Sequence, residues 1–379
     1  MQRRDTREIV MGKLVIGGQN PVYVEGMGRQ NPYQVELAIQ EINRAQAAGC
    51  EIFRLSIPEK SALEGAKKIK EWTKIPLIAD VHFNLDLATE CVRLGFEAVR
   101  INPGTLGDRS RLEELFSVLR DHNTVLRVGA NAGSLPAHLR SLPRVEALFE
   151  SIVEMVDFAE KKGVKNLFLS AKSTEVEETV EINRRLSKAF PYPIHIGVTE
   201  AGEGLEGVVK SALGIGLVLF EGIGNSIRVS LTSRDPVLEV KVAWMILNFL
   251  GLRRRGGEII SCPTCARCRG DVVDAVERVK AFFEEQGIVP PFRIAIMGCE
   301  VNGPGEAREA EVGLAFSRSG AVIFSKGRVE KVVPDREVLE YFIAFLAEKI
   351  KSVEAEKGGS SFEDVSSVCP NSKRNTSGS

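Results

Sequence analysis

The stretch Ile75-Pro76-Leu77-Ile78-Ala79-Asp80-Val81-His82-Phe83 is a short apolar run that carries polar residues near its end. Residues 85–94 follow it with the apolar periodicity and the charged face of a surface helix. Such a pair predicts a strand that leads directly into a helix. Strands that alternate with helices along a chain indicate a parallel sheet.

Runs of this kind recur through the first two thirds of the chain, with helical segments between them. They are Val22–Met27, Ile52–Ile57, Ile75–Phe83, Ala98–Ile101, Val125–Gly129, Leu167–Ser170, Ile194–Val198 and Ile227–Leu231. Eight such units in about 250 residues fit a closed TIM (β/α)8 barrel better than an open doubly wound sheet. The open sheet is the alternative, although no glycine-rich fingerprint follows the first run. Residues 12–18 are expected to form a hairpin at the bottom of the barrel.

A second domain is predicted after the run Arg253-Arg254-Arg255-Gly256-Gly257. The basic triplet suits the C-terminus of the helix expected over Pro236–Leu250. We expect the barrel over residues 1–252, a smaller α/β domain over residues 257–351 and a disordered tail over residues 352–379. The elements expected in the smaller domain are helices near Val272–Gln286 and Arg336–Ile350 and strands near Phe292–Met297, Ala321–Phe324 and Val329–Val333.

Composition excludes several classes of protein. The formal net charge of the 379 residues is -1. This balance argues against binding to nucleic acid or to a membrane surface, which usually requires a basic excess. The charged N-terminal segment has no apolar signal region, and no apolar stretch is long enough to span a bilayer. We therefore expect a cytoplasmic protein, in which an odd set of seven cysteines indicates metal or redox chemistry.

The ends of the predicted strands supply an unusual number of polar side chains. In a barrel these ends converge on one mouth, where active sites lie. Five cations occur there, together with Asp80, His82, Asn131, Glu200 and Ser230. The cations are Arg54, Arg100, Arg127, Lys172 and Arg228. A cationic surplus of this size predicts an anionic ligand with phosphate groups, because arginine offers paired donors to phosphate oxygens.

Three residues of this set are candidates for catalysis. In a strand, alternate residues share a face, so Asp80 and His82 are expected to point the same way and to act as an acid/base or orienting pair. Glu200 directly follows an apolar run. It could donate a proton or pair with the cations, and we favour proton donation.

The cysteines of the second domain suggest a metal centre. Cys262, Cys265 and Cys268 have C-x2-C-x2-C spacing, and Cys299 lies further along the chain. Structural zinc, an iron–sulfur cluster and a thiol–disulfide pair are all compatible with this spacing. Spacing alone would nominate Cys268 as the fourth ligand. It favours a metal without deciding which one.

Several motifs resemble the bacterial 4-hydroxy-3-methylbut-2-enyl diphosphate synthase family of the non-mevalonate isoprenoid pathway. The resemblance covers about residues 3–350. It is carried by Ala79–Phe83, Arg100–Gly104, Gly129–Leu135, Gly197–Gly202, Arg228–Thr232, Ile260–Cys265 and Gly298–Glu306. The family pairs a TIM barrel with a smaller iron–sulfur domain.

The resemblance implies a 4Fe–4S cluster bound by Cys262, Cys265, Cys299 and Glu306 rather than by Cys268. It implies substrate contacts from the mouth residues named above, with Glu200 near the reacting carbon. The implied reaction is reductive ring opening of 2-C-methyl-D-erythritol 2,4-cyclodiphosphate, with ferredoxin or flavodoxin as the electron donor. Two alternatives are a barrel enzyme with a structural zinc domain and a non-catalytic iron–sulfur redox protein.

A homodimer with a shared active site is expected for a geometric reason. The helix after the eighth strand returns to the bottom of the barrel, away from the mouth. The linker of about six residues then spans at most about 20 Å, so a partner's cluster domain reaches the mouth more easily than the chain's own. The resemblance implies the same arrangement.

One stretch departs from the family pattern. The family usually has a Gln-Ser-Met-Thr-Asn-Thr type run after the first strand, where this chain has Glu25-Gly26-Met27-Gly28-Arg29-Gln30-Asn31-Pro32. Part of the barrel mouth is therefore expected to differ from that of the family.

Overall fold

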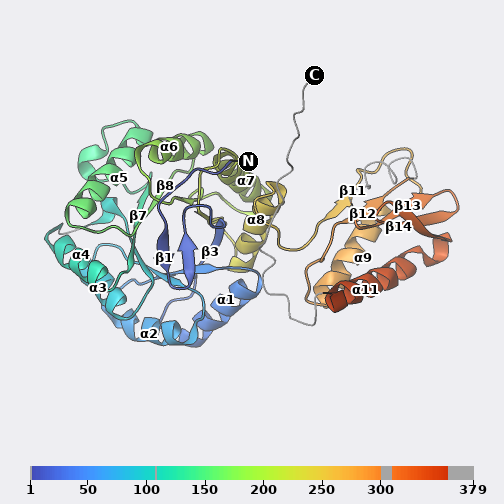
Figure 1. The fold of residues 1–379 in the computed structure, drawn as a ribbon, viewed down its shortest axis with the longest axis horizontal. Coiled ribbons are helices and arrows are strands. Elements are labelled where there is room, and N and C mark those ends of the chain that lie inside the picture. Colours follow the sequence, from blue (N-terminus) through green and yellow to red (C-terminus); the bar gives the residue numbers. More distant parts are fainter. Residues whose placement is uncertain (1, 107–108, 300–309, 357–379) are drawn as a thin grey trace, which may run out of the picture. The chain divides into compact units, whose positions relative to one another are not determined.

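The computed structural model describes residues 2–106, 109–299 and 310–356. The chain divides into two compact units, Met1–Arg253 and Arg254–Ser379. In Figure 1 the first unit runs from blue to yellow and the second from orange to red.

The first unit is a TIM barrel, as the alternation of strands and helices predicts. Its strands are parallel and pair in the order β8-β7-β6-β5-β4-β3-β10-β9. An isolated parallel bridge between Leu169 and Ile194 joins the two ends of this order and closes the barrel. The strands are β3 Tyr23–Met27, β4 Ile52–Ser56, β5 Leu77–Asp80, β6 Ala98–Ile101, β7 Val125–Asn131, β8 Leu167–Lys172, β9 His195–Ile196 and β10 Ser226–Ile227.

Helices surround the strands (Figure 1) because each has an apolar face that packs on the outside of the sheet. They are α1 Val35–Ala47, α2 Leu63–Trp72, α3 Leu85–Arg93, α4 Leu112–Asp121, α5 Arg144–Lys161, α6 Val176–Ala189, α7 Gly204–Phe220 and α8 Pro236–Phe249. Caps define several helix starts. The side chain of Asn84 accepts from the backbone N–H groups of Asp86 and Leu87 at the start of α3.

A hairpin plugs the amino-terminal end of the barrel, as expected, although it begins before residues 12–18, over which it was predicted. Strands β1 (Ile9–Met11) and β2 (Leu14–Ile16) pair antiparallel. Their buried side chains pack on residues that point inward from the barrel strands. Those residues are Tyr23, Ile52, Ile78, Ala98, Val125 and Phe168. The bottom of the barrel interior is therefore apolar, and the polar residues lie above it, toward the mouth.

Several barrel strands end at positions that differ from the expected ones, and in β5, β7 and β9 the difference moves a candidate site residue. β5 ends at Asp80, so His82 lies beyond it, and Phe83 has a φ of 62° that turns the chain away. β7 continues to Asn131 rather than ending at Gly129. β9 ends at Ile196, so Glu200 lies well past the strand.

The second unit is a five-stranded sheet with the order β11-β12-β13-β14-β15. Its first three strands are parallel and its last two pairings are antiparallel. The strands are β11 Ile259–Ser261, β12 Ile294–Met297, β13 Val312–Ser317, β14 Gly320–Ser325 and β15 Arg328–Val333. Helices α9 (Val272–Glu285) and α11 (Val338–Glu356) pack on this sheet through one apolar core.

The sequence prediction of this unit was incomplete. It missed β11 and β13, and it ended the last helix at Ile350, whereas α11 continues to Glu356. None of the helices that the structure describes combines the length and the apolarity of a membrane-spanning helix.

Candidate active site

A cavity of about 220 Å³ opens at the carboxyl ends of the barrel strands. Most of the residues predicted at the mouth line it. They are Arg54, Asp80, His82, Arg100, Asn131, Lys172, Arg228 and Ser230, joined by Met27, Val198 and Thr199. Arg127 and Glu200 are absent from this lining. The structure therefore gathers eight of the predicted residues and places two elsewhere.

Asp80 organises one side of the cavity. Its Oδ1 accepts a hydrogen bond of 3.0 Å from Nη1 of Arg100, and its Oδ2 lies 3.8 Å from Nε of Arg54. Burial alone would raise the pKa of the Asp80 carboxyl, but the two guanidinium groups outweigh burial and hold the pKa well below its usual value. Asp80 is thus ionised at neutral pH, where it holds two arginines in place and cannot act as a proton donor.

His82 is held by partners on both ring nitrogens. Nε2 lies 2.8 Å from Nη1 of Arg100, and Nδ1 lies 3.1 Å from Oγ1 of Thr105. Arginine only donates, so Nε2 is the acceptor and the proton is on Nδ1. Burial, reinforced by Arg100, keeps the pKa of His82 below its usual value despite the nearby Asp80. This network assigns a neutral His82 that orients Arg100.

Arg127 lies beneath the cavity. Its Nη1 donates to Oε2 of Glu25 at 2.5 Å, and its guanidinium lies 5.5 Å from the centre of the Phe168 ring. In the β7–β8 register Arg127 is level with Phe168, whereas Asn131 is level with Lys172 at the mouth. The extra residues at the end of β7 account for this depth.

Among the described residues, Lys172 is the cavity cation whose charge is least balanced by a nearby carboxylate. Its side chain is buried, and the described residues record no hydrogen bond or ion pair for it. Burial lowers the pKa of Lys172 well below the usual value, and Arg54, Arg127 and Arg228 lower it further. An anion in the cavity would favour the charged amine and so counteract the lowering of the pKa of Lys172.

Arg228 shares a buried carboxylate with Arg29. Oε1 of Glu239 on α8 lies 3.6 Å from Nη2 of Arg228 and 3.2 Å from Nη2 of Arg29, and it accepts from the backbone N–H of Leu231 at 2.7 Å. Arg29 belongs to the stretch that departs from the family pattern. Here it fixes the loop after β3 to the loop after β10.

Glu200 lies outside the cavity lining and is exposed to solvent. Its φ of 51° is in the left-handed region, which is unfavourable for a residue with a side chain. Strain of this kind is often found at functional sites. The described residues record no ion pair for Glu200, so the salt-bridge alternative receives no support from the structure.

The second unit brings three of its cysteines close together. Cys262 and Cys299 follow the neighbouring parallel strands β11 and β12, so they emerge at the same sheet edge. The backbone N–H of Gly298 donates to Sγ of Cys262 at 3.1 Å. A Cβ on Gly298 would lie 2.5 Å from Sγ of Cys268 and 3.3 Å from Sγ of Cys262. Glycine at this position leaves the space that the sulfur atoms occupy.

Two further observations concern the predicted ligands. Cys265 is exposed, and its carbonyl accepts from the N–H of Cys268 at 2.9 Å. Cys262, Cys265 and Cys268 are present as thiols without a disulfide bond. Glu306 lies outside the described residues, and within those residues no group of His, Cys, Asp and Glu side chains has the geometry of a metal site.

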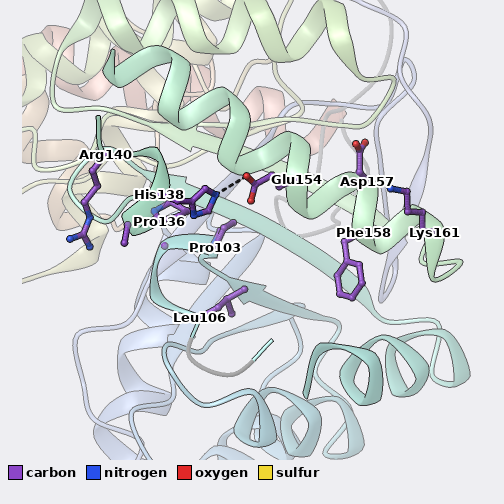
Figure 2. A pocket seen from close by; sticks show the side chains of 11 residues that line it. Pro103, Leu106, Pro136, His138, Arg140, Glu154, Asp157, Phe158 and Lys161 are labelled. Atoms are coloured by element: carbon purple, nitrogen blue, oxygen red, sulfur yellow. Dashed lines mark hydrogen bonds and ion pairs between the residues drawn. The ribbon is translucent and has the colours of Figure 1, made fainter. Parts of the chain in front are cut away.

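A second cavity, of about 750 Å³, lies on the outside of the barrel (Figure 2). Pro103 and Leu106 form one wall, and the side chains of α5 form the opposite wall. His138 reaches across to Glu154, with 2.7 Å between Nε2 and Oε1. Cations and carboxylates alternate here without a surplus of either sign. This cavity lacks the concentration of buried cations that distinguishes the barrel mouth.

Sequence reasoning missed three buried polar residues around the site, namely Glu25, His195 and Glu239. Nδ1 of His195 lies 2.7 Å from Oγ of Ser226 and 3.3 Å from Oε2 of Glu25. The signal was available for Glu25 and His195, because each is a polar residue within a predicted apolar strand. Nothing in the sequence marked Glu239, which lies on a helix.

Each of the two structural units matches a known protein-family model. The model described as the GcpE TIM-barrel domain matches residues 6–244, and the one described as the GcpE protein C-terminal domain matches residues 258–348. The chain belongs to the GcpE family. Its two structural units thus correspond to the two parts of a GcpE protein.

Several curated relatives of this GcpE chain share the name 4-hydroxy-3-methylbut-2-en-1-yl diphosphate synthase (flavodoxin). The protein of Nitratidesulfovibrio vulgaris is 44% identical over 88% of this chain and 86% of its own length. The protein of Lawsonia intracellularis is 42% identical over 89% of this chain and 94% of its own length. The protein of Thermodesulfovibrio yellowstonii is 41% identical over 90% of this chain and 98% of its own length. These matches extend through the barrel and the second unit.

Proposed function

We propose that this GcpE chain is a 4-hydroxy-3-methylbut-2-enyl diphosphate synthase. The reaction takes 2-C-methyl-D-erythritol 2,4-cyclodiphosphate, two electrons and two protons. It opens the ring, removes one oxygen as water and leaves a linear diphosphate. The observation that carries the proposal is the buried cationic cavity at the barrel mouth, in a chain whose relatives share the synthase name.

The cavity is suited to hold the cyclodiphosphate. Arg54, Arg100, Lys172 and Arg228 supply donors for the phosphate oxygens. Asn131 and Ser230 add neutral hydrogen bonds. Asp80 and His82 hold Arg54 and Arg100 in place rather than exchanging protons with the substrate. Arg127, which the sequence placed among the substrate ligands, would act from below through its charge.

Glu200 is proposed as the proton donor. It stands on a strained turn after β9, next to Thr199, which lines the cavity. Replacing Glu200 with Gln keeps the size and the hydrogen-bonding capacity of the side chain but removes the proton. The Glu200→Gln variant should bind the cyclodiphosphate almost normally and turn over slowly. An effect confined to KM would contradict this role.

The second unit is proposed to hold a 4Fe–4S cluster through Cys262, Cys265, Cys299 and Glu306. The donor set fits, because thiolates are the usual ligands of such clusters and Cys262 and Cys299 follow neighbouring parallel strands, with the N–H of Gly298 donating to Sγ of Cys262. When bound, the cluster supplies electrons one at a time. Glu306, as a harder oxygen ligand, would be the most readily displaced of the four.

Flavodoxin is the proposed electron donor, since the names of the relatives specify it. Ferredoxin is the second candidate. We also propose a cytoplasmic location, where both carriers and a reduced cluster would be compatible with the environment.

A homodimer with a shared active site is proposed from the path of the chain out of the barrel. Arg253, the last residue of the barrel unit, donates to the carbonyl of Val22 at 3.0 Å and to Oε2 of Glu51 at 2.7 Å. Both partners precede strands and lie at the end opposite the mouth. The chain therefore leaves the barrel far from the cavity.

An apolar surface on two neighbouring helices supports the same proposal. Large apolar side chains are exposed at intervals of three, four or seven residues, so they share one face on each helix. They are Leu205, Val209, Leu213, Leu217 and Phe220 on α7 and Leu238, Met245 and Phe249 on α8. Helices α7 and α8 pack side by side (Figure 1). A second copy of the chain would bury this α7/α8 face.

Complementation tests the shared site. Glu200→Gln lacks the barrel function and Cys265→Ser lacks the cluster, so each homodimer should be inactive. Subunit exchange should restore activity, because one of the two sites in a mixed dimer then has an intact barrel and an intact cluster. Mixed dimers that show no more activity than either parent would favour a site formed within one chain.

Turnover tests the function itself. The chain, reconstituted anaerobically with iron and sulfide, should convert the cyclodiphosphate to the linear diphosphate when reduced flavodoxin is present. The structural-zinc and redox-carrier alternatives both predict no conversion. Neither alternative is supported by the three relatives described above, which are named as the synthase.

A further inference from the structure

Glu25 is a buried carboxylate in the centre of the barrel. It lies on β3 with no exposed side-chain surface and does not line the cavity. Four strands direct polar or charged groups toward it. Oε2 meets Arg127 of β7 at 2.5 Å and His195 of β9 at 3.3 Å, and Oε1 faces Nε of Arg54 of β4 at 3.8 Å. Lys172 of β8 lies close enough to influence its ionisation.

The carboxylate is ionised in this environment. Burial raises the pKa of Glu25, but Arg127 and Arg54 outweigh burial and leave the pKa below its usual value. His195 does not compete for the negative charge, because burial and the surrounding cations hold its pKa well below the usual value and keep it neutral. The negative charge of Glu25 therefore balances the positive charges of Arg127 and Arg54.

The carboxylates around the cavity differ in their main partners, although Asp80 and Glu25 both lie 3.8 Å from Nε of Arg54. Asp80 is paired with Arg100 and Arg54, and Glu239 is paired with Arg228 and Arg29. Among the described residues, Glu25 is the carboxylate that pairs with Arg127. Its contact with Arg54 is looser, since neither Nε of Arg54 nor Oε1 of Glu25 has a hydrogen bond within the described structure.

Two consequences follow for an anion in the cavity. Nη1 of Arg127 donates to Glu25, and the guanidinium lies against the Phe168 ring, so the group is held below the cavity, although its Nε has no hydrogen-bond partner among the described residues. The negative charge of Glu25 also opposes the potential of the cations above it. Both effects are strong in a buried site, where the effective dielectric constant is low.

We propose that Glu25 is a positioning residue of the diphosphate site, which holds Arg127 beneath the cavity and limits how tightly the cavity binds a diphosphate. This inference rests on the proposed function, in which substrate and product both carry diphosphate groups. An enzyme gains nothing by binding both more tightly. A counter-charge below the site keeps the product releasable while the arginines remain in place.

The test is calorimetric binding of inorganic diphosphate to the full, iron-loaded chain at low ionic strength, without turnover. Glu25→Gln should lower the dissociation constant about tenfold, because one opposing buried charge is removed. Arg127→Gln should raise it by a similar factor, because Glu25 is left without its closest cation. The dissociation constant of the double variant, Glu25→Gln with Arg127→Gln, should return to within about threefold of the wild-type value.

Glu51→Gln is the matched control. Glu51 also pairs with an arginine, the half-buried Arg253, but at the opposite end of the barrel. Its loss should leave the affinity for diphosphate unchanged. Loss of packing around a buried carboxylate would weaken binding, so tighter binding by Glu25→Gln is a result that a purely structural role does not produce.

Different outcomes of this experiment would overturn the role of Glu25 and the proposed function. Unchanged or weaker diphosphate binding by Glu25→Gln would overturn the inference. It would also be overturned if Arg127→Gln reduced the affinity equally in the wild type and in the Glu25→Gln variant, because Arg127 would then be a direct ligand. If Glu25→Gln fails to fold, the step from Arg127→Gln to the double variant measures the same carboxylate. A wild-type chain that does not bind diphosphate would overturn the proposed function and this inference with it.

Discussion

Nη1 of Arg100 lies 2.8 Å from Nε2 of His82 and 3.0 Å from Oδ1 of Asp80, so one guanidinium nitrogen joins the histidine to the carboxylate. The donor can only be Arg100, which makes His82 a neutral acceptor with its proton on Nδ1. Nitrogen-15 NMR of the histidine rings at pH 7 should show this tautomer for His82. An imidazolium signal, or a proton on Nε2, would contradict the orienting role proposed for His82.

Lys172 should make diphosphate binding depend on pH. Its lowered pKa in the empty cavity means that binding takes up a proton once the pH exceeds that value, since a bound anion favours the charged amine. Affinity should therefore fall as the pH rises from the pKa of the empty site toward that of the complex. Calorimetry in buffers of different ionisation enthalpy measures the proton uptake.

Lys172→Arg is the control for this titration, because arginine stays charged over the whole range. The difference in proton uptake between the wild type and this variant isolates the lysine from the titration of diphosphate itself. Equal proton uptake by the two proteins would show that Lys172 is already charged in the empty cavity.

Gly298→Ala should reduce the iron content of the reconstituted chain several-fold while the second unit remains folded. The added Cβ would lie 3.3 Å from Sγ of the assigned ligand Cys262, which must give by a few tenths of an ångström, and 2.5 Å from Sγ of Cys268, which must move. Iron analysis and circular dichroism give the two readouts. Gly216→Ala is the control, since nothing lies within 4 Å of the Cβ that it adds. Full iron content in Gly298→Ala would place the cluster elsewhere.

The fourth cluster ligand can be tested by paired substitutions. Cys268→Ser should keep the iron and most of the activity, because Sγ of Cys268 donates to the carbonyl of Gly270 at 3.1 Å and is not assigned to the cluster. Glu306→Ala should lose activity. Loss of iron in Cys268→Ser, with normal iron and turnover in Glu306→Ala, would reverse the assignment.

The α7/α8 face should hold the homodimer together. Leu213→Glu puts a charge at the middle of the exposed face of α7 and should yield monomers in analytical ultracentrifugation, with iron content retained and turnover reduced at least about tenfold. Trp72→Glu alters an exposed residue on α2 and should leave the association unchanged. A Leu213→Glu chain that remains dimeric would place the interface on another surface.

Much of the mouth could be predicted from the sequence, because side chains at the ends of parallel strands converge whatever their exact register. Arg54, Asp80, Lys172 and Arg228 line the cavity for this reason. The depth of Arg127 could not be predicted. Gly129 suggested a strand end, whereas β7 continues to Asn131 and leaves Arg127 further inside.

The second unit was harder to predict because its short strands carry weak signals. β11 has three residues, and its pairing with β12 comes from segments far apart in the sequence. That pairing brings Cys262 next to Gly298. Local periodicity contains no information about such a contact, whereas the cysteine spacing alone indicated a metal centre.

The most direct test of the account is the amount of product formed per electron supplied. Flavodoxin reduced with a known number of electrons is mixed anaerobically with the iron-loaded chain and the cyclodiphosphate, and the linear diphosphate is quantified by mass spectrometry. We predict one molecule of 4-hydroxy-3-methylbut-2-enyl diphosphate for each two electrons, and none with Cys265→Ser. An iron-loaded chain that binds the cyclodiphosphate and accepts electrons yet forms no linear product would contradict the account.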